Sequence, residues 1–153
     1  MERRCFLQAG LATAELSLLL ASGLVPTRVL AEWPSDAFHA GNMAEIERIL
    51  FGDAQIEDTD QITIDAPDIA ENGAKVPVDV RVQLPGAESL VLLSEKNPFP
   101  LLAQAHFTPE VESDLSVRVK MGDTGNLVAI VEADGKLYRA VRAVKVAAGG
   151  CGA

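Results

Sequence analysis

Alternation of apolar and polar residues with a period of two is the feature of this sequence that most limits its fold. It is clearest in residues 76–84, where valine or leucine occupies every second position. Such a pattern is typical of a β-strand with one buried face. Similar or shorter apolar patterns recur in residues 62–64, 90–93, 101–107, 115–121, 127–133 and 137–146. About seven strands, separated by turns such as Asp134-Gly135, predict an all-β fold built as an antiparallel sandwich.

A helical segment precedes the strands in residues 33–52. The apolar residues Met43, Ile46 and Ile49 are three residues apart, which places them on one face of a helix. Ser35 or Asp36 is suited to cap its start and Gly52 to end it. We expect this helix to pack on the core of the sandwich. The alternative is a helix that binds a partner.

Residues 1–31 have the pattern of an export signal. Arg3-Arg4 precedes a mostly apolar run in residues 9–25, and residues 29–31 offer small side chains to a signal peptidase. The paired arginines resemble the twin-arginine type of signal. The run contains Glu15 and is shorter than the ~20 apolar residues of a membrane-spanning helix. We therefore expect cleavage after residue 31, a periplasmic location and no membrane attachment of the mature protein.

The charge and the content of cysteine and histidine exclude several classes of function. The 153 residues carry a net charge of −9, and because the leader holds three basic and two acidic residues, the mature charge is −10. So acidic a chain lacks the basic surface that nucleic acids and anionic membranes require. Once Cys5 is removed with the leader, one cysteine and two histidines are too few for a zinc site built from four such ligands. With no nucleotide-binding motif either, we expect no cofactor and no metal.

Residues 147–153 follow the last predicted strand and contain no side chain larger than a methyl group except that of Cys151. Gly149, Gly150 and Gly152 leave the backbone wide conformational freedom. Fully extended, residues 147–151 reach about 16–18 Å. The sequence thus predicts a domain in residues 32–146 followed by a flexible C-terminal arm that carries one thiol.

Cys151 is the only cysteine that remains after cleavage of the leader, so it cannot form an internal disulfide. Catalytic cysteines are held beside a base, but no basic residue is close to Cys151 in sequence; the nearest is Lys145, six residues before it. The arm therefore fits a carrier whose thiol reacts in the active sites of other proteins. Two alternatives stay open: a structural or adaptor domain linked to a second copy by a disulfide of Cys151, and a cysteine without a role.

Several segments resemble the SoxY family, the sulfur-carrier subunits of the SoxYZ complex. The ending GGCGA at residues 149–153 is similar to the Gly-Gly-Cys-Gly-Gly terminus of that family. The other similar segments are PDIAENGA at 67–74 with VPV at 76–78, KNPFPL at 96–101, RVKMG at 118–122 and ADGKLY at 133–138. The resemblance runs through most of the mature chain, and the leader agrees with it.

This resemblance implies an immunoglobulin-like sandwich that pairs with SoxZ and is exported with it on one leader. It implies that Cys151 holds the sulfur intermediates of thiosulfate oxidation, with Gly149, Gly150 and Gly152 as its flexible mount. The haem enzyme SoxXA would join thiosulfate to the thiol, SoxB would hydrolyse off sulfate, and in some organisms SoxCD would oxidise the remaining sulfur. The carrier itself would not be an enzyme.

Two residues depart from the family pattern. Ala153 replaces the last glycine and adds one methyl group at the tip of the arm. Phe99, between two prolines, replaces a polar residue; we expect it in the core, and the alternative is a contact with a partner. His39 and His106 have no metal-ligating neighbour in sequence, and we expect surface or core roles for both.

Overall fold

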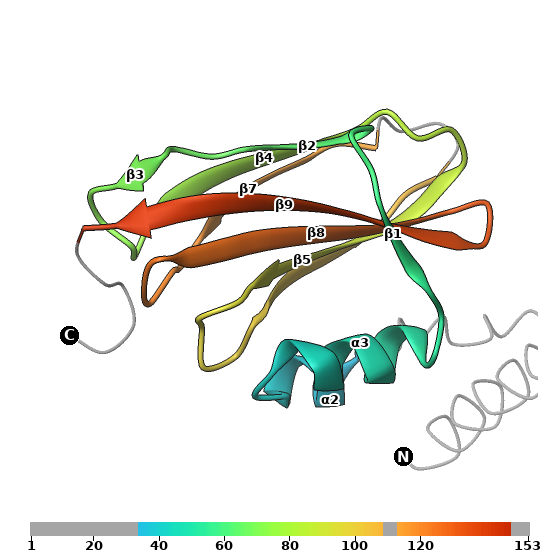
Figure 1. Ribbon diagram of the computed structural model, residues 1–153, viewed down its shortest axis with the longest axis horizontal. Coiled ribbons are helices and arrows are strands. Elements are labelled where there is room, and N and C mark those ends of the chain that lie inside the picture. Colours follow the sequence, from blue (N-terminus) through green and yellow to red (C-terminus); the bar gives the residue numbers. More distant parts are fainter. Residues whose placement is uncertain (1–33, 109–112, 148–153) are drawn as a thin grey trace, which may run out of the picture. The chain divides into compact units, whose positions relative to one another are not determined.

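The chain forms two β-sheets that pack face to face, with two short helices on one side (Figure 1). This computed structural model describes residues 34–108 and 113–147. The strands are β1 (Ile56–Asp58), β2 (Ile62–Asp65), β3 (Ile69–Ala70), β4 (Val76–Val82), β5 (Ala87–Ser94), β6 (Leu101–His106), β7 (Leu115–Val119), β8 (Gly125–Ala133) and β9 (Lys136–Val146). The larger sheet has the order β1-β9-β8-β5-β6, with β3 also paired to β9, and the smaller sheet has the order β2-β4-β7. The predicted all-β sandwich is confirmed.

The main core lies between the two sheets. Val76, Val78 and Val80 on β4 are at most 1% exposed, and Leu90 of β5 and Leu127 of β8 are fully buried in the same cluster. Burial of this apolar surface is the main favourable contribution to folding. The alternation in β4 therefore reflects one face turned into the sandwich and one turned outward.

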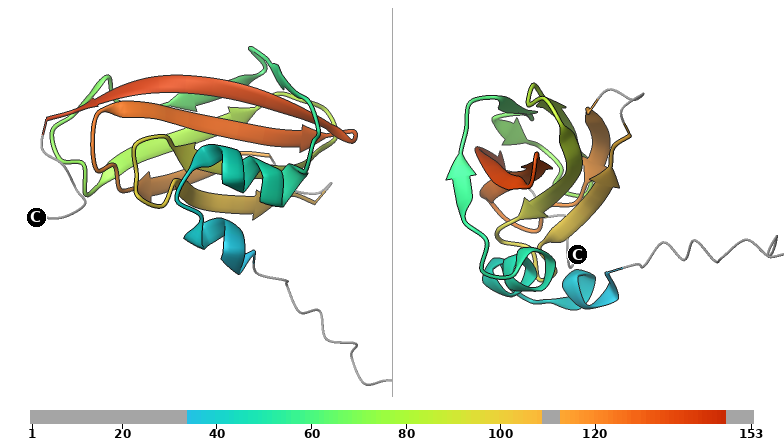
Figure 2. Two further views of the ribbon diagram at one scale, coloured as in Figure 1. Left: turned by 60° about the horizontal axis from the view of Figure 1, so that its bottom comes forward. Right: turned by 90° about the vertical axis from the view of Figure 1, so that its right-hand side faces the viewer.

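A second core lies on the outer face of the larger sheet, under the helices α2 (Ser35–His39) and α3 (Met43–Phe51) (Figure 2). Ala37 of α2 and Ile46 of α3 are fully buried there against alternate residues of β5 and β8, among them Val91 and Ile130. Alternate side chains of β5 enter the two cores, so residues 90–93 are all buried, in agreement with their uninterrupted apolar run. Neither described helix is long and apolar enough to cross a membrane.

The helical segment differs from the expected single helix. Asn42 has an extended backbone, and its side-chain oxygen accepts a hydrogen bond of 2.9 Å from the N–H of Glu45, so it caps α3 and separates it from α2. Pro34 is the N-cap of α2, without a side-chain cap, so neither Ser35 nor Asp36 has that role. Gly52 ends α3 with a φ of +64°, as predicted.

β1 and β3 were not predicted, and they pair with β9 in parallel. β1 aligns with Leu137–Arg139 near the start of β9, and β3 aligns with Lys145 and Val146 at its end. The rest of the larger sheet is antiparallel. These two short strands hold both ends of β9 on the side that β8 does not cover, which matters because the predicted C-terminal arm follows β9.

Candidate functional site

The end of β9 is fixed on both sides up to Ala147. On one side, Ala147 donates its N–H to the carbonyl oxygen of Ala70 next to β3, at 2.9 Å. On the other side, Val146 donates its N–H to the hydroxyl oxygen of Thr124, also at 2.9 Å. The point from which residues 148–153 continue is therefore part of the rigid sandwich.

Cys151 and the glycines Gly149, Gly150 and Gly152 lie outside the described residues, so their predicted roles stay predictions. Their distance from the sandwich is nevertheless bounded by the sequence. Cys151 is four residues beyond Ala147, and four residues span at most about 13–14 Å. Any protein that reacts with the thiol of Cys151 must come within that distance of the end of β9.

Three loops surround the end of β9, at the left of Figure 1. They are residues 71–75 before β4, residues 95–100 between β5 and β6, and residues 120–124 before β8. The pairing of β5 with β8, of β8 with β9 and of β4 with β7 brings them to one end of the sandwich. We call the surface formed by these three loops and Ala147 the arm end.

A buried asparagine joins two loops of the arm end. Asn97 is 8% exposed; its side-chain N–H donates to the carbonyl oxygen of Lys120 at 2.7 Å, and its side-chain oxygen accepts from the N–H of Gly122 at 2.9 Å. A buried amide with both ends paired holds its surroundings in one arrangement. Sequence reasoning missed this residue, because an asparagine before a proline looks like any turn residue.

The third loop is joined to the other two through the backbone. Met121, which is fully buried, donates its N–H to the carbonyl oxygen of Gly73 at 2.7 Å. Asn72 closes the turn before β4 by accepting from the N–H of Ala74 at 2.8 Å. The three loops of the arm end are therefore one hydrogen-bonded unit, which also includes Thr124 and through it the end of β9.

The prediction that Phe99 lies in the core is wrong, because its side chain is 58% exposed. The loop is closed beneath it: Ser94 donates its N–H to the carbonyl oxygen of Pro100 at 2.8 Å, while Asn97 turns inward. Between these anchored points, Pro98 and Phe99 are left outside. Phe99 is thus an aromatic side chain presented at the arm end.

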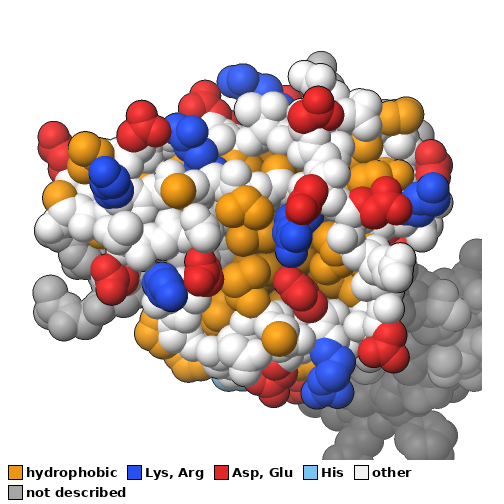
Figure 3. Space-filling model, viewed as in Figure 1, with side chains coloured by type: hydrophobic (Ala, Val, Ile, Leu, Met, Phe, Trp, Pro, Cys, Tyr) orange, Lys and Arg blue, Asp and Glu red, His pale blue; other side chains and the backbone are white. Residues whose placement is uncertain are grey.

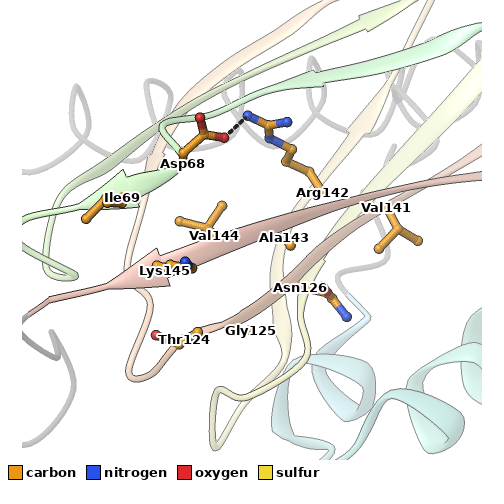
Figure 4. A pocket seen from close by; sticks show the side chains of 10 residues that line it. All are labelled: Asp68, Ile69, Thr124, Gly125, Asn126, Val141, Arg142, Ala143, Val144 and Lys145. Carbon is orange, nitrogen blue, oxygen red and sulfur yellow. Dashed lines mark hydrogen bonds and ion pairs between the residues drawn. The ribbon is translucent and has the colours of Figure 1, made fainter.

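A shallow hollow of about 680 Å³ lies along the second half of β9, beside the arm end (Figure 4). Ile69 and Val141 line it with side chains that are 59% and 54% exposed. At its rim, Arg142 forms an ion pair of 2.6 Å with Asp68. Figure 3 shows this face of the molecule with apolar side chains gathered between charged ones.

The lysines are concentrated around the arm end. Four of the five lysines of the chain lie in its three loops or on β9 two residues before Ala147: Lys75, Lys96, Lys120 and Lys145. Acidic residues in the same loops are Glu71, Glu95 and Asp123. In a chain with a net charge of −9, this end has no excess of negative charge.

Two described groups with shifted pKa values, Asp58 and Arg139, lie near the start of β9, away from the arm end. A hydrogen bond of 2.8 Å from Arg139, together with its positive charge, holds the pKa of Asp58 below its ordinary value. Asp58 in turn raises the pKa of Arg139. The pair fixes β1 to the start of β9 and takes no part in the arm end.

The histidines do not form a site in the part of the chain that the structure describes. The Nδ1 atom of His39 lies 2.6 Å from the carbonyl oxygen of Ser35, within its own helix, and His106 is exposed at the end of β6 away from the arm end. In residues 34–108 and 113–147, no group of histidine, cysteine, aspartate or glutamate is arranged to hold a metal ion.

Comparison with known proteins identifies the family of this chain. Residues 47–151 match the model of the family described as "Sulfur oxidation protein SoxY". The solved structure of the sulfur carrier protein SoxY from Chlorobium limicola f thiosulfatophilum is 43% identical, with a TM-score of 0.62 over 67% of this chain and 94% of that one. Superoxide reductase (neelaredoxin) from Ignicoccus hospitalis is 24% identical over 56% of this chain and 80% of that one, with a TM-score of 0.47. No curated protein matches the sequence. With more than half of its length matched, the chain belongs to the SoxY family.

Proposed function

We propose that this protein is a periplasmic sulfur carrier that holds the intermediates of thiosulfate oxidation on the thiol of Cys151. A sulfur-carrier role follows from membership of the SoxY family, which consists of carriers and not of enzymes. The family match extends through residue 151 and so includes Cys151 itself, and this observation carries the proposal. The fixed end of β9 supports it, because a short arm on a rigid body keeps its thiol within a limited distance of the sandwich.

The carrier chemistry needs only a thiol and two kinds of partner. In the first step, an oxidising enzyme joins the thiol sulfur of Cys151 to the outer sulfur of thiosulfate, and one proton and two electrons are lost. In the second step, water cleaves the outer sulfur–sulfonate bond, sulfate and a proton are released, and a persulfide remains on Cys151. Gly149, Gly150 and Gly152 let the arm enter a narrow channel, because they carry no side chain.

The partners follow from the Sox system. As a SoxY protein, the chain is a component of the SoxYZ complex. We further propose a heterodimer with SoxZ and transient binding to SoxXA, SoxB and, where present, SoxCD. A leader of the twin-arginine type, with Arg3-Arg4, would export the folded pair; residues 1–31 lie outside the described part of the chain.

The test is the mass of the C-terminal peptide in protein isolated from cells that oxidise thiosulfate. We expect thiosulfonate and persulfide forms on the wild-type peptide and none on Cys151→Ser, which should lose all thiosulfate-dependent turnover. Ala148→Ser is the matched control, since it adds a hydroxyl to the arm and keeps the thiol. Full turnover by Cys151→Ser would contradict the proposal. A disulfide-linked dimer that reduces to unmodified monomer would instead support the adaptor domain.

A further inference from the structure

We propose that the arm end is the docking surface for the enzymes that act on Cys151, and that Phe99 is its anchor. The inference rests on the proposed function, because it takes Cys151 as the thiol that these enzymes use. The partner is defined by its chemistry: an enzyme with an apolar socket, bordered by carboxylates, beside the mouth of its active site.

The reach of the arm brings the 95–100 loop within the interface of an enzyme centred over the end of β9. The Cα atom of Cys151 stays within about 14 Å of that of Ala147, and its thiol reaches one short side chain further. Adjacent strands are about 4.8 Å apart, so β5, two strands from β9, lies about 10 Å to the side. A specific interface covers about 800 Å² on each partner, which is a disc of about 16 Å radius. An enzyme seated over the end of β9 therefore covers the 95–100 loop.

Phe99 is the residue of the arm end that is best suited to such a contact. The large apolar side chains that are exposed in the described residues are Ile49, Ile69, Phe99 and Val141. Only Phe99 among these is aromatic, and only Phe99 lies in the loops of the arm end. Aromatic anchors that enter a pocket on the partner supply much of the binding energy of an interface.

Phe99 is also held in place before it binds. Pro98 and Pro100 restrict the backbone on both sides of it. A hydrogen bond from the N–H of Ser94 to the carbonyl oxygen of Pro100 closes the loop. Two hydrogen bonds of the Asn97 side chain join it to the 120–124 loop. A side chain on a rigid loop loses little conformational entropy on binding, so more of its burial contributes to affinity.

The charges around Phe99 specify the rim of the socket. Lys96 is in the same loop as Phe99. Lys120 is held next to that loop, because its carbonyl oxygen accepts a hydrogen bond from the side chain of Asn97. Both lysine side chains are exposed, although Lys96 is 3.4 Å from Glu95. Carboxylates on the enzyme would complement them, whereas the remaining surface of this acidic chain would be repelled.

The experiment measures thiosulfate-dependent loading of Cys151 by its loading enzyme, with the SoxYZ complex as the varied substrate. For Phe99→Gln we expect kcat/KM to fall about tenfold, the loss from truncating an anchor residue, with kcat at saturating carrier unchanged. Ile49→Gln is the matched control, because it removes an exposed apolar side chain from α3. The rate of alkylation of Cys151 by iodoacetamide should be the same in all three proteins.

The outcomes separate this inference from the proposed function. A kcat/KM for Phe99→Gln within twofold of wild type, or an equal loss for Ile49→Gln, would overturn the docking role of Phe99 alone. Failure of Phe99→Gln to form the SoxYZ complex would also overturn it, because Phe99 would then be a contact with SoxZ. A fall in kcat with unchanged KM would also overturn it, since docking acts on the encounter and not on the chemical step. A wild-type carrier that takes up no sulfur would overturn the proposed function and this inference together.

Discussion

The two ends of the sandwich are built from similar hairpins and turns but are held together differently. At the arm end, the loops are joined by side-chain and backbone bonds of 2.7–2.9 Å, through Asn97 and Met121. At the opposite end, backbone bonds join Phe107 to Glu88 at 2.8 Å and Asp134 to Gly86 at 3.3 Å, and the hydroxyl of Ser89 donates to Glu132 at 3.3 Å. The difference lies in the buried polar side chains: Asn97 at the arm end has both its N–H and its oxygen paired with backbone, whereas buried Ser89 at the opposite end makes one longer bond.

The two ends also differ in charge, because the lysines are concentrated at the arm end. The arm end combines lysines with a comparable number of acidic residues, while the opposite end has Glu88, Glu132 and Asp134 near Lys136. If enzymes approach Cys151 as proposed, they meet a hydrogen-bonded surface at this end that has no excess of negative charge.

The largest expected effect is on stability. Asn97→Ala removes two hydrogen bonds from a buried side chain and leaves the carbonyl of Lys120 and the N–H of Gly122 without that partner. We expect the free energy of unfolding, measured with urea, to fall by about 2 kcal/mol. The matched variant at the opposite end is Ser89→Ala, for which the loss should be about 0.5 kcal/mol. Equal losses would mean that the arm end is not the more firmly held of the two.

Reversing the charge of single lysines should slow association with the loading enzyme at the arm end but not at the opposite end. Lys96→Glu and Lys120→Glu add negative charge at the arm end, and Lys136→Glu makes the same change at the opposite end. We expect the association rate with the loading enzyme to fall about three- to tenfold for the first two at low salt, and to change less than twofold for the third. The difference should shrink as salt is added, because these charges are exposed. Three equal effects would contradict a directed approach.

The strands could be predicted where their pattern is long enough. The alternation in residues 76–84 and the apolar runs at 90–93 and 127–133 predicted strands of a sandwich, but not which strands form each of its two sheets. β1 and β3 have three and two residues and carry no period, and β1 pairs with a part of β9 that is about 80 residues away. Such a pairing depends on the tertiary fold and leaves no local signal.

The site could be predicted only in part. The thiol and the glycines around Cys151 stand out in sequence, and their roles stay predictions. The bracing of the arm end by Asn97 could not be foreseen, because its partners are the backbones of Lys120 and Gly122, more than 20 residues away. Phe99 was misjudged for a related reason: hydrophobicity predicts burial, but a loop anchored by its neighbours leaves this side chain outside.

A smaller effect is expected at the last fixed point of the arm. Thr124→Val removes the hydroxyl that accepts from the N–H of Val146 and keeps the shape of the side chain. Because the bond is exposed, we expect the free energy of unfolding to fall by at most about 1 kcal/mol. Amide hydrogen exchange of Val146 should nevertheless become clearly faster, while that of Leu137, at the start of β9, should not change. Unchanged exchange at Val146 would show that β3 alone holds the end of β9.

The smallest expected effect concerns the ion pair at the start of β9. The pKa of Asp58 is lowered in the folded protein by the hydrogen bond and charge of Arg139, so the pair stabilises the fold above the ordinary pKa of 3.8. That contribution is lost as the pH falls through the lower pKa of the folded state. Asp58→Asn should therefore be slightly less stable than wild type at pH 7, and the two should converge in urea unfolding below pH 3.8. The difference is small because Asp58 is fully exposed and its charge is screened. A gap that widened towards low pH would mean that Asp58 does not stabilise the fold through its charge.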